Sequence, residues 1–340
     1  MPTSTVDTSP LNKLPYFEDL EVGMVFRAPG VTLTSGHAAL HQAILGDRLR
    51  LPLDAPLAAA VTGGAAPLAH PGLVCDVGIG QSTLPTQRVI GNLFYRGLAL
   101  RRLPAIGDTL RTDTEVVALR QNSSKEGRPA TGLAALRIST VDAEGRPVLD
   151  FHRCAMLPLR DRDGATGRAD DLEGIGSEMS SEALAEPIAG WDLDAFRAAA
   201  PGPHFADMPA SGRWELEGGD VVSCAPELAR LTTNIALAHH DAAAGGRGRR
   251  LVYGGHTIGI AAASLTRALP NLLTILGWHS CDHTGPVFEG DTLRGDLELE
   301  STESLPSGGG LLHLRMRMRA ERGGGDVDEV LDWRLVAAMA

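Results

Sequence analysis

The sequence has few aromatic residues and no excess of positive charge. Aromatic side chains make up 4% of the 340 residues, so the core must rest on Leu, Val, Ile and Ala. The formal net charge of -11 argues against nucleic acid as the main partner, because a protein that binds many phosphates needs a basic face. This balance still allows a local basic pocket for one phosphorylated ligand.

Cysteine is scarce, and no C-x-x-C pair is present. The four cysteines are Cys75, Cys154, Cys224 and Cys281. We expect reduced thiols that pack as small hydrophobic groups. A second set of potential ligands follows no recognised metal-ligand spacing: His239, His240, Asp241, His279, Asp282 and His283. We therefore expect no metal site.

Several common motifs and segments are also missing. There is no G-x-S-x-G, no P-loop lysine motif and no dinucleotide fingerprint, so we expect no nicotinamide or nucleotide cofactor. The first 15 residues have neither a basic start nor an apolar core, unlike a signal peptide. The longest apolar run, around 258–263, is too short to cross a bilayer. We expect a cytoplasmic protein with no membrane insertion.

The first half contains helix signals followed by strand signals. Residues 1–15 are polar and Pro-containing, which predicts a disordered arm. Apolar spacing predicts a helix over 34–45, capped by Thr34 or Ser35, and a buried helix over 72–80. Four strand-like segments separated by turns come next: 92–103, 109–119, 132–142 and 148–157.

The second half repeats this order after an acidic, Gly/Ser-rich stretch at 159–189. Three pairs of landmarks keep nearly one offset: Asp108 and Asp291 (183 residues), Asp150 and Asp332 (182), and His70 and His256 (186). This regularity predicts a tandem duplication, with domains at 16–158 and 190–338 joined by a linker. Each copy should be an α+β unit in which an antiparallel sheet wraps a long apolar helix.

The segment 231–268 contains most of the residues that could take part in catalysis. We expect Asn234, His239, His240 and Asp241 to lie within two helical turns. A glycine pair then precedes His256 and an apolar helix. Glycines permit a sharp turn and a close backbone approach, and a helix start presents unpaired N–H groups. The combination suits chemistry on a polarised carbonyl compound.

Three features carry a resemblance to a known family: the strand entries PAIGDTL and PVFEGDTL, the stretch RRLVYGGHTIGIA, and N-x-x-x-x-H at Asn234 to His239. Together with the duplication, they resemble MaoC-like acyl dehydratases of the hotdog fold, in the double-hotdog form. They are similar to mesaconyl-CoA hydratases and (R)-specific enoyl-CoA hydratases over about residues 16–336. The resemblance implies a tandem hotdog, an acyl-CoA substrate and hydration or dehydration without a cofactor.

The resemblance also implies roles for individual residues. In (R)-specific hydratases the motif G-D-x-N-P-x-H holds the attacking water with its Asp and His. His239 matches that histidine, whereas Asn234 replaces the aspartate and could only orient water. The carbonyl-binding amide falls within Gly255, His256 and Thr257. In the first half Pro52 replaces the histidine, which implies a degenerate copy that shapes the acyl pocket.

The residues themselves leave other interpretations open. His239, the expected base and acid, could be a surface histidine, and Asn234 could be a structural amide. Asp241 could orient His239 or cap a turn, and His256 could simply pack under the sheet. Three arginines precede the apolar helix: Arg247, Arg249 and Arg250. They could clamp CoA phosphates or form a solvated turn.

Two other functions fit the same fold. A thioesterase would release free CoA thiol, and a silent acyl-CoA binding protein would bind without turnover. Asn234 in place of an acid favours the silent protein, because an amide transfers no proton. We also expect that two copies of the chain could form a homodimer.

Overall fold

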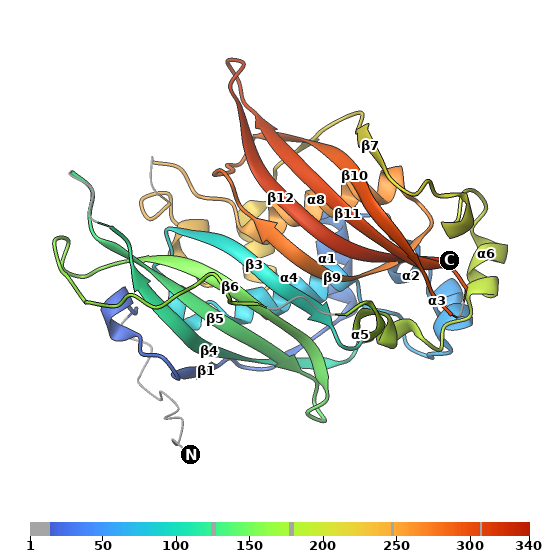
Figure 1. The fold of residues 1–340 in the computed structure, drawn as a ribbon, viewed down its shortest axis with the longest axis horizontal. Coiled ribbons are helices and arrows are strands. Elements are labelled where there is room, and N and C mark those ends of the chain that lie inside the picture. The colour runs from blue at the N-terminus through green and yellow to red at the C-terminus, as the bar shows by residue number, and fades with distance from the viewer. Residues whose placement is uncertain (1–13, 124–126, 177–179, 246–247, 307) are drawn as a thin grey trace.

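The computed structural model describes residues 14–340 except 124–126, 177–179, 246–247 and 307. The expected disordered arm falls almost wholly outside the described residues. Two halves built from the same series of elements lie side by side (Figure 1). Both therefore have the α+β architecture expected from the sequence.

The first half contains short strands and helices followed by four long strands. Its helices are η1 (Phe17–Asp19), α1 (Ser35–Leu45), α2 (Arg50–Leu53), α3 (Ala55–Thr62), α4 (Pro71–Gln81) and η2 (Leu84–Thr86). Its strands are β1 (Val25–Arg27), β2 (Val31–Thr32), β3 (Gly91–Leu100), β4 (Thr109–Gln121), β5 (Thr131–Val141) and β6 (Pro147–Pro158). Both predicted helices and all four predicted strands are confirmed. Thr34 is the N-cap of α1, because its side chain accepts a hydrogen bond from His37 N at 3.2 Å.

The second half repeats the series. Helices α5 (Ser181–Ala185) and η3 (Glu186–Ile188) end the acidic segment 159–189. The helices of the second half are α6 (Leu193–Ala199), η4 (Phe205–Asp207), α7 (Ala225–Leu231), η5 (Leu237–His239) and α8 (Gly254–Ala268). Its strands are β7 (Gly212–Glu215), β8 (Asp220–Val221), β9 (Leu272–Asp282), β10 (Thr292–Ser304), β11 (Gly310–Glu321) and β12 (Val327–Met339). The expected two helical turns over 234–241 are wrong. The chain leaves α7 at Leu231, and Thr233 adopts a left-handed backbone with φ 58°.

A single sheet joins the two halves. Its strand order is β1-β4-β5-β6-β3-β9-β12-β11-β10-β7. The halves meet where β3 pairs with β9 in antiparallel register, with Tyr95 opposite Cys281. Through this pairing the two halves extend each other's sheet, and β3 and β9 lie in the middle of the strand order.

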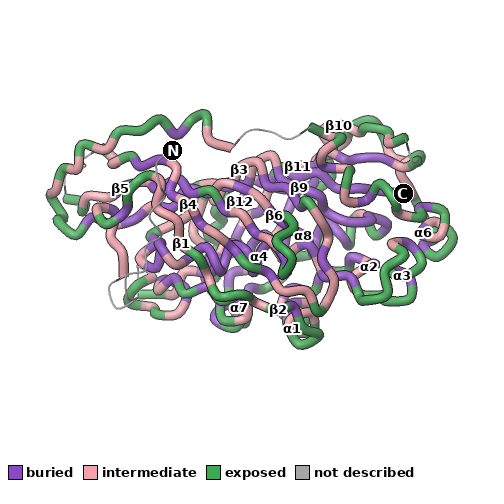
Figure 2. Tube along the Cα trace, turned by 90° about the horizontal axis from the view of Figure 1, so that it is seen from below, coloured by how far each residue is buried: buried purple, intermediate pink, exposed green. Residues whose placement is uncertain are grey.

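Helices α4 and α8 lie against the sheet and form the middle of the core. Figure 2 shows both surrounded by buried chain. Leu73, Val77 and Leu265 are fully buried, and each contributes about 1.5–3 kcal/mol of hydrophobic stabilisation. The helices are therefore wrapped by the sheet, as their apolar composition predicts.

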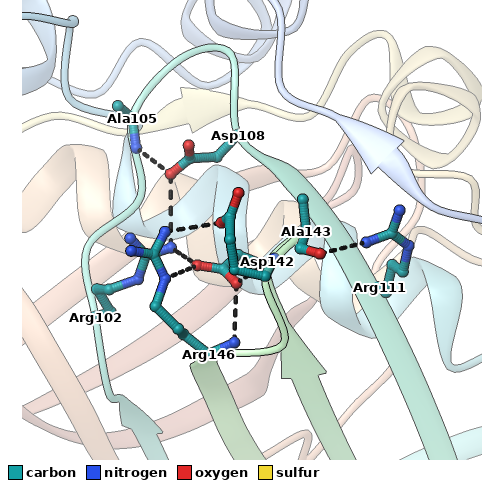
Figure 3. Close-up of polar contacts among 8 residues, drawn as sticks. Arg102, Ala105, Asp108, Arg111, Asp142, Ala143 and Arg146 are labelled. Atoms are coloured by element: carbon teal, nitrogen blue, oxygen red, sulfur yellow. Dashed lines mark hydrogen bonds and ion pairs between the residues drawn. The ribbon is translucent and has the colours of Figure 1, made fainter.

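The aspartate of each GDTL motif has the same structural role in its half. Asp108 Oδ2 accepts a hydrogen bond from Ala105 N at 3.0 Å, and Asp291 Oδ2 accepts one from Phe288 N at 3.0 Å. Each aspartate thereby closes the turn that opens a long strand. Figure 3 shows Asp108 beside the neighbouring turn, where Arg102 and Arg146 both point at the buried carboxylate of Asp142.

One predicted equivalence between the halves is wrong. His70 is the N-cap of α4, and Tyr253, 183 residues later, is the N-cap of α8. Tyr253 therefore corresponds to His70, whereas His256 lies within the first turn of α8. The offset of 183 is the one that Asp108 and Asp291 share, so the structure makes the repeat more regular than the sequence comparison indicated.

The acidic segment 159–189 packs on the first half along much of its described length. Leu172 is buried against Ala118, Ala135 and Cys154. Asp170 Oδ2 also accepts a hydrogen bond from Leu119 N at 2.8 Å. The domain boundaries remain a prediction. Within the described ranges, no helix is long and apolar enough to cross a membrane.

Candidate functional site

A cavity of about 290 Å³ lies at the junction of the two halves. The first half contributes the end of α4, the start of β3 and the second half of β6. The second half contributes the loop before η5, the start of α8 and the segment after β9. The polar residues of its lining are Thr83, Thr86, Asn92, Tyr95, Arg153, Asn234, His239, Tyr253, Thr257, His283 and Thr284. The motif pair Asn234 and His239 is thus brought together with the start of α8.

His239 presents one ring nitrogen to this cavity. Its Nδ1 lies 2.8 Å from the Leu251 carbonyl, which can only accept, so Nδ1 carries the proton and donates. Nε2 then keeps its lone pair, and it has no hydrogen-bond partner among the described residues. Burial lowers the pKa of His239 to about 4, the Leu251 bond opposes this, and His240 and Arg153 add to the lowering. Because His239 is buried, it is not a surface histidine.

Asn234 is held as a donor rather than an acceptor. Its Oδ1 accepts a hydrogen bond from Ala236 N at 3.0 Å, which fixes which atom of the side-chain amide is the oxygen. The other atom, Nδ2, is then left as the donor. The left-handed Thr233 just before it occupies the position that Gly46, at φ 70°, holds in the first half. The side-chain amide thus offers N–H groups to a bound water or oxyanion.

The start of α8 supplies backbone donors. His256 N bonds to Tyr253 O at 2.9 Å, whereas the Gly254 and Gly255 N–H groups have no acceptor among the described residues. Gly254 and Thr257 line the cavity. The expected sharp turn at the glycine pair is wrong, because both residues belong to α8 and neither has a positive φ.

The glycines instead permit close packing. A Cβ on Gly255 would lie 2.0 Å from Asp76 Oδ1, and a Cβ on Gly254 would lie 2.5 Å from His283 Nε2. Gly255 therefore faces Asp76 of α4, away from the cavity that Gly254 lines. Asp76 is also bonded by Tyr253 OH at 3.1 Å and His41 Nε2 at 3.1 Å.

Several predicted site residues lie outside the cavity lining. His256 is fully buried, and neither ring nitrogen has a partner among the described residues. Asp241 is exposed, and its Oδ1 accepts a hydrogen bond from Ala243 N at 2.9 Å. The orienting partner of His239 is therefore the Leu251 carbonyl. His240 donates from Nε2 to Asn234 O at 2.7 Å and supports the loop.

The arginines before α8 already have acidic partners. Arg249 stacks over the Phe288 ring at 4.3 Å and lies 3.7 Å from Asp291 Oδ1. Arg250 pairs with Glu289 Oε2. Arg247 lies outside the described residues. Neither described arginine lines the cavity, so a CoA-clamping role for them remains a prediction.

Sequence reasoning missed Arg153 and Tyr95, cross-strand neighbours on β6 and β3 that both line the cavity. A signal was present: Leu149, Phe151, Ala155 and Leu157 alternate as buried residues along β6, and Arg153 falls in the same series. A charged residue on the inward face of a strand is rare, so it is a candidate for a functional role. His283, considered only as a metal ligand, also lines the cavity, and burial followed by the neighbouring His239 lowers its pKa to about 4.

The first half retains a closed remnant of the same arrangement. Asp47 pairs with His70 Nε2 at 3.0 Å, inside a pocket of about 20 Å³. This space holds little beyond a water molecule. In the part of the chain that the structure describes, no three His, Cys, Asp or Glu side chains are grouped to hold a metal ion.

Known proteins resemble this chain along nearly its whole length. The structure of RV0216, a conserved hypothetical protein of Mycobacterium tuberculosis with a double hotdog fold, is 54% identical, with a TM-score of 0.88 and coverage of 96% of this chain and 98% of that one. A putative MaoC domain protein dehydratase of Chloroflexus aurantiacus is 25% identical, with a TM-score of 0.84 and the same coverage. The mesaconyl-CoA hydratase of Cereibacter sphaeroides is 29% identical over 308 residues, or 88% of each chain. No family model matches the chain.

Proposed function

Because this chain belongs to the MaoC-like double-hotdog family of hydro-lyases, we propose that it adds water to, or removes water from, an α,β-unsaturated acyl-CoA thioester. One observation carries the proposal: His239 and Gly254, the first residue of α8, both line the same cavity. The base and the carbonyl-binding donor of a hydration come from these two elements.

In the hydration direction, the thioester oxygen accepts a hydrogen bond from Gly254 N–H at the positive end of the α8 dipole. Asn234 Nδ2 donates to the oxygen of a water molecule, and His239 Nε2 accepts a proton from it. The water oxygen bonds to the β-carbon, and the electrons of the double bond move onto the thioester oxygen as an enolate. His239 then returns its proton to the α-carbon, which restores the neutral imidazole.

The lowered pKa of His239 favours the second proton transfer, from His239 to the α-carbon. A histidinium with a pKa of about 4 is a strong acid, so it readily gives its proton to carbon. The same value makes the neutral imidazole a weak base, so the first proton transfer needs the help of the Gly254 amide.

A silent acyl-CoA binding protein is the second candidate, and the engaged Asn234 side chain favours it. Because Oδ1 already accepts from Ala236 N, Asn234 does not replace the acceptor that an aspartate would provide. The two candidates differ only in turnover, so both require the cavity to bind acyl-CoA.

A panel of trans-2-enoyl-CoAs tests the proposal, with absorbance of the conjugated thioester and free thiol recorded together. Loss of absorbance without thiol release supports a hydratase. Thiol release would indicate a thioesterase. Tight binding with no change in either signal would indicate the silent protein and contradict the proposal.

A further inference from the structure

His283, the residue that follows β9, brings a second imidazole to the cavity. Asp282, the last residue of β9, anchors this end of the strand, because its Oδ1 pairs with Arg96 Nη1 at 2.7 Å. The His283 ring packs edge-on against the Tyr95 ring, with the two centroids 5.9 Å apart. These contacts limit the directions in which the imidazole can point.

The Nε2 edge of the His283 ring faces the start of α8. A Cβ added to Gly254 would lie 2.5 Å from His283 Nε2 and 2.8 Å from its Cε1, so glycine at this position leaves room for the ring. His283 Nε2 is buried and has no hydrogen-bond partner among the described residues. The Gly254 N–H group likewise has no acceptor there. Two polar groups without partners therefore lie close together at one wall of the cavity.

A ligand oxygen at this wall would satisfy both groups. A buried polar atom without a partner costs about 1–3 kcal/mol, so a ligand group that pairs with it is favoured. Neutral imidazole can carry its proton on either nitrogen, and the hydrogen-bond partner decides which. An oxygen acceptor beside Gly254 N–H selects the tautomer of His283 that has the proton on Nε2. That oxygen then accepts two hydrogen bonds, one from the backbone and one from the ring.

We propose that His283 Nε2–H is the second donor to the thioester oxygen, so that this ring and the Gly254 amide together form the oxyanion hole of the enolate. The inference rests on the proposed function, because the oxygen that it names belongs to the acyl-CoA thioester. His283 keeps its proton through the whole cycle, and no bond to it forms or breaks. Proton transfer to and from carbon and water is left to His239.

The charge of His283 agrees with this role. Burial, and next the neighbouring His239, lower the pKa of His283 to about 4, so its ring is neutral at neutral pH. A neutral ring does not repel the positive charge that His239 acquires when it takes a proton from water. A neutral imidazole can also polarise a carbonyl oxygen on which negative charge develops. A second donor at that oxygen favours the first proton transfer, for which His239 is a weak base.

The carbonyl stretching frequency of a bound thioester tests this inference apart from turnover. The probe is butyryl-CoA labelled with ¹³C at the thioester carbonyl, because a saturated acyl group has no double bond to hydrate. Each hydrogen bond to the carbonyl oxygen lowers the frequency. Isotope-edited infrared spectra should therefore show a lower frequency on the wild-type chain than on His283→Phe, whose ring fills the same space without a donor.

Two further variants complete the comparison. His283→Gln, which keeps a side-chain N–H, should recover part of the frequency shift. His313→Phe makes the same exchange on β11, outside the cavity lining, and should match the wild-type chain. For the enoyl-CoA that the wild-type chain hydrates, kcat should fall about 10²- to 10³-fold in His283→Phe with KM nearly unchanged, which is the usual cost of one missing oxyanion donor.

Equal carbonyl frequencies in the wild-type and His283→Phe complexes would overturn the inference and leave the hydratase proposal intact. A lower frequency on the wild-type chain without hydration of any enoyl-CoA would support the inference and contradict the hydratase proposal. Failure of the wild-type chain to bind butyryl-CoA would overturn both. If the larger ring of His283→Phe prevents folding, ¹⁵N NMR of the wild-type chain still decides the matter. His283 Nε2 should carry the proton in the butyryl-CoA complex, and an unprotonated Nε2 there would refute the assignment.

Discussion

Gly80 of α4 packs against the loop of the second half that carries Asn234 and His239. A Cβ at this position would lie 1.8 Å from the Thr232 carbonyl oxygen and 3.1 Å from Asn234 N. Both neighbours are backbone atoms and cannot rotate away. Gly80→Ala therefore forces the loop back by about 1 Å or more. Overpacking of this kind costs about 1–3 kcal/mol, from which the helix propensity of alanine recovers about 1 kcal/mol.

Gly78→Ala in the same helix is the matched control. Its Cβ would meet Leu149 Cδ2 at 2.9 Å, and that methyl group belongs to a flexible side chain. In urea unfolding, the free energy of unfolding of Gly80→Ala should be about 2 kcal/mol lower than that of Gly78→Ala. Because a 1 Å misplacement of catalytic groups costs about 10²-fold in rate, turnover should fall by that factor in Gly80→Ala alone. Equal stability and equal turnover in the two variants would refute the packing argument.

Three further predictions follow from individual contacts. Thr233→Gly should raise the free energy of unfolding by about 1 kcal/mol, because it relieves a β-branched residue at φ 58°; no gain in urea unfolding would contradict this. Tyr253→Phe should cost about 1.5–3 kcal/mol through the lost bond to Asp76, whereas Tyr95→Phe, whose hydroxyl has no partner among the described residues, should cost less than 1 kcal/mol in the same assay. Desolvation lowers the pKa of three histidines to about 4: His239, His256 and His283. In the unfolded chain these histidines bind protons near pH 6.5, so their contribution to stability is complete above that pH. Between about pH 6.5 and 4 the free energy of unfolding should fall by roughly 1.4 kcal/mol per pH unit for each histidine. A flat profile over this range would contradict the burial of these rings.

The elements of the fold could be predicted because local signals agree with the tertiary structure. Period-two alternation marked the long strands, and the wholly apolar stretches at α4 and α8 required a covering sheet. The α7–η5 loop was harder to predict. Its apolar residues mimic helical spacing, and only the left-handed Thr233 breaks the helix. No propensity rule assigns that conformation to a threonine.

The site could be predicted only where its residues are close in sequence. Asn234 and His239 stand in one motif, and both line the cavity. Arg153 and Tyr95 come from the other half, across the β3–β9 junction, and no spacing in a single sequence brings them to His239. Asp241, two residues after His239, was one possible partner for its ring, but the backbone carbonyl of Leu251 takes that place. Backbone acceptors leave no trace in a residue pattern.

A hydration reaction in this cavity depends on His239, which moves the proton in the proposed mechanism. The most direct test compares His239→Gln with the wild-type chain on the preferred enoyl-CoA. The control is His37→Gln, which changes a half-buried histidine on α1 that lies outside the cavity lining. We predict that kcat falls by about 10²- to 10⁴-fold in His239→Gln, that substrate affinity changes little, and that His37→Gln retains full activity. Wild-type turnover in His239→Gln would contradict the account.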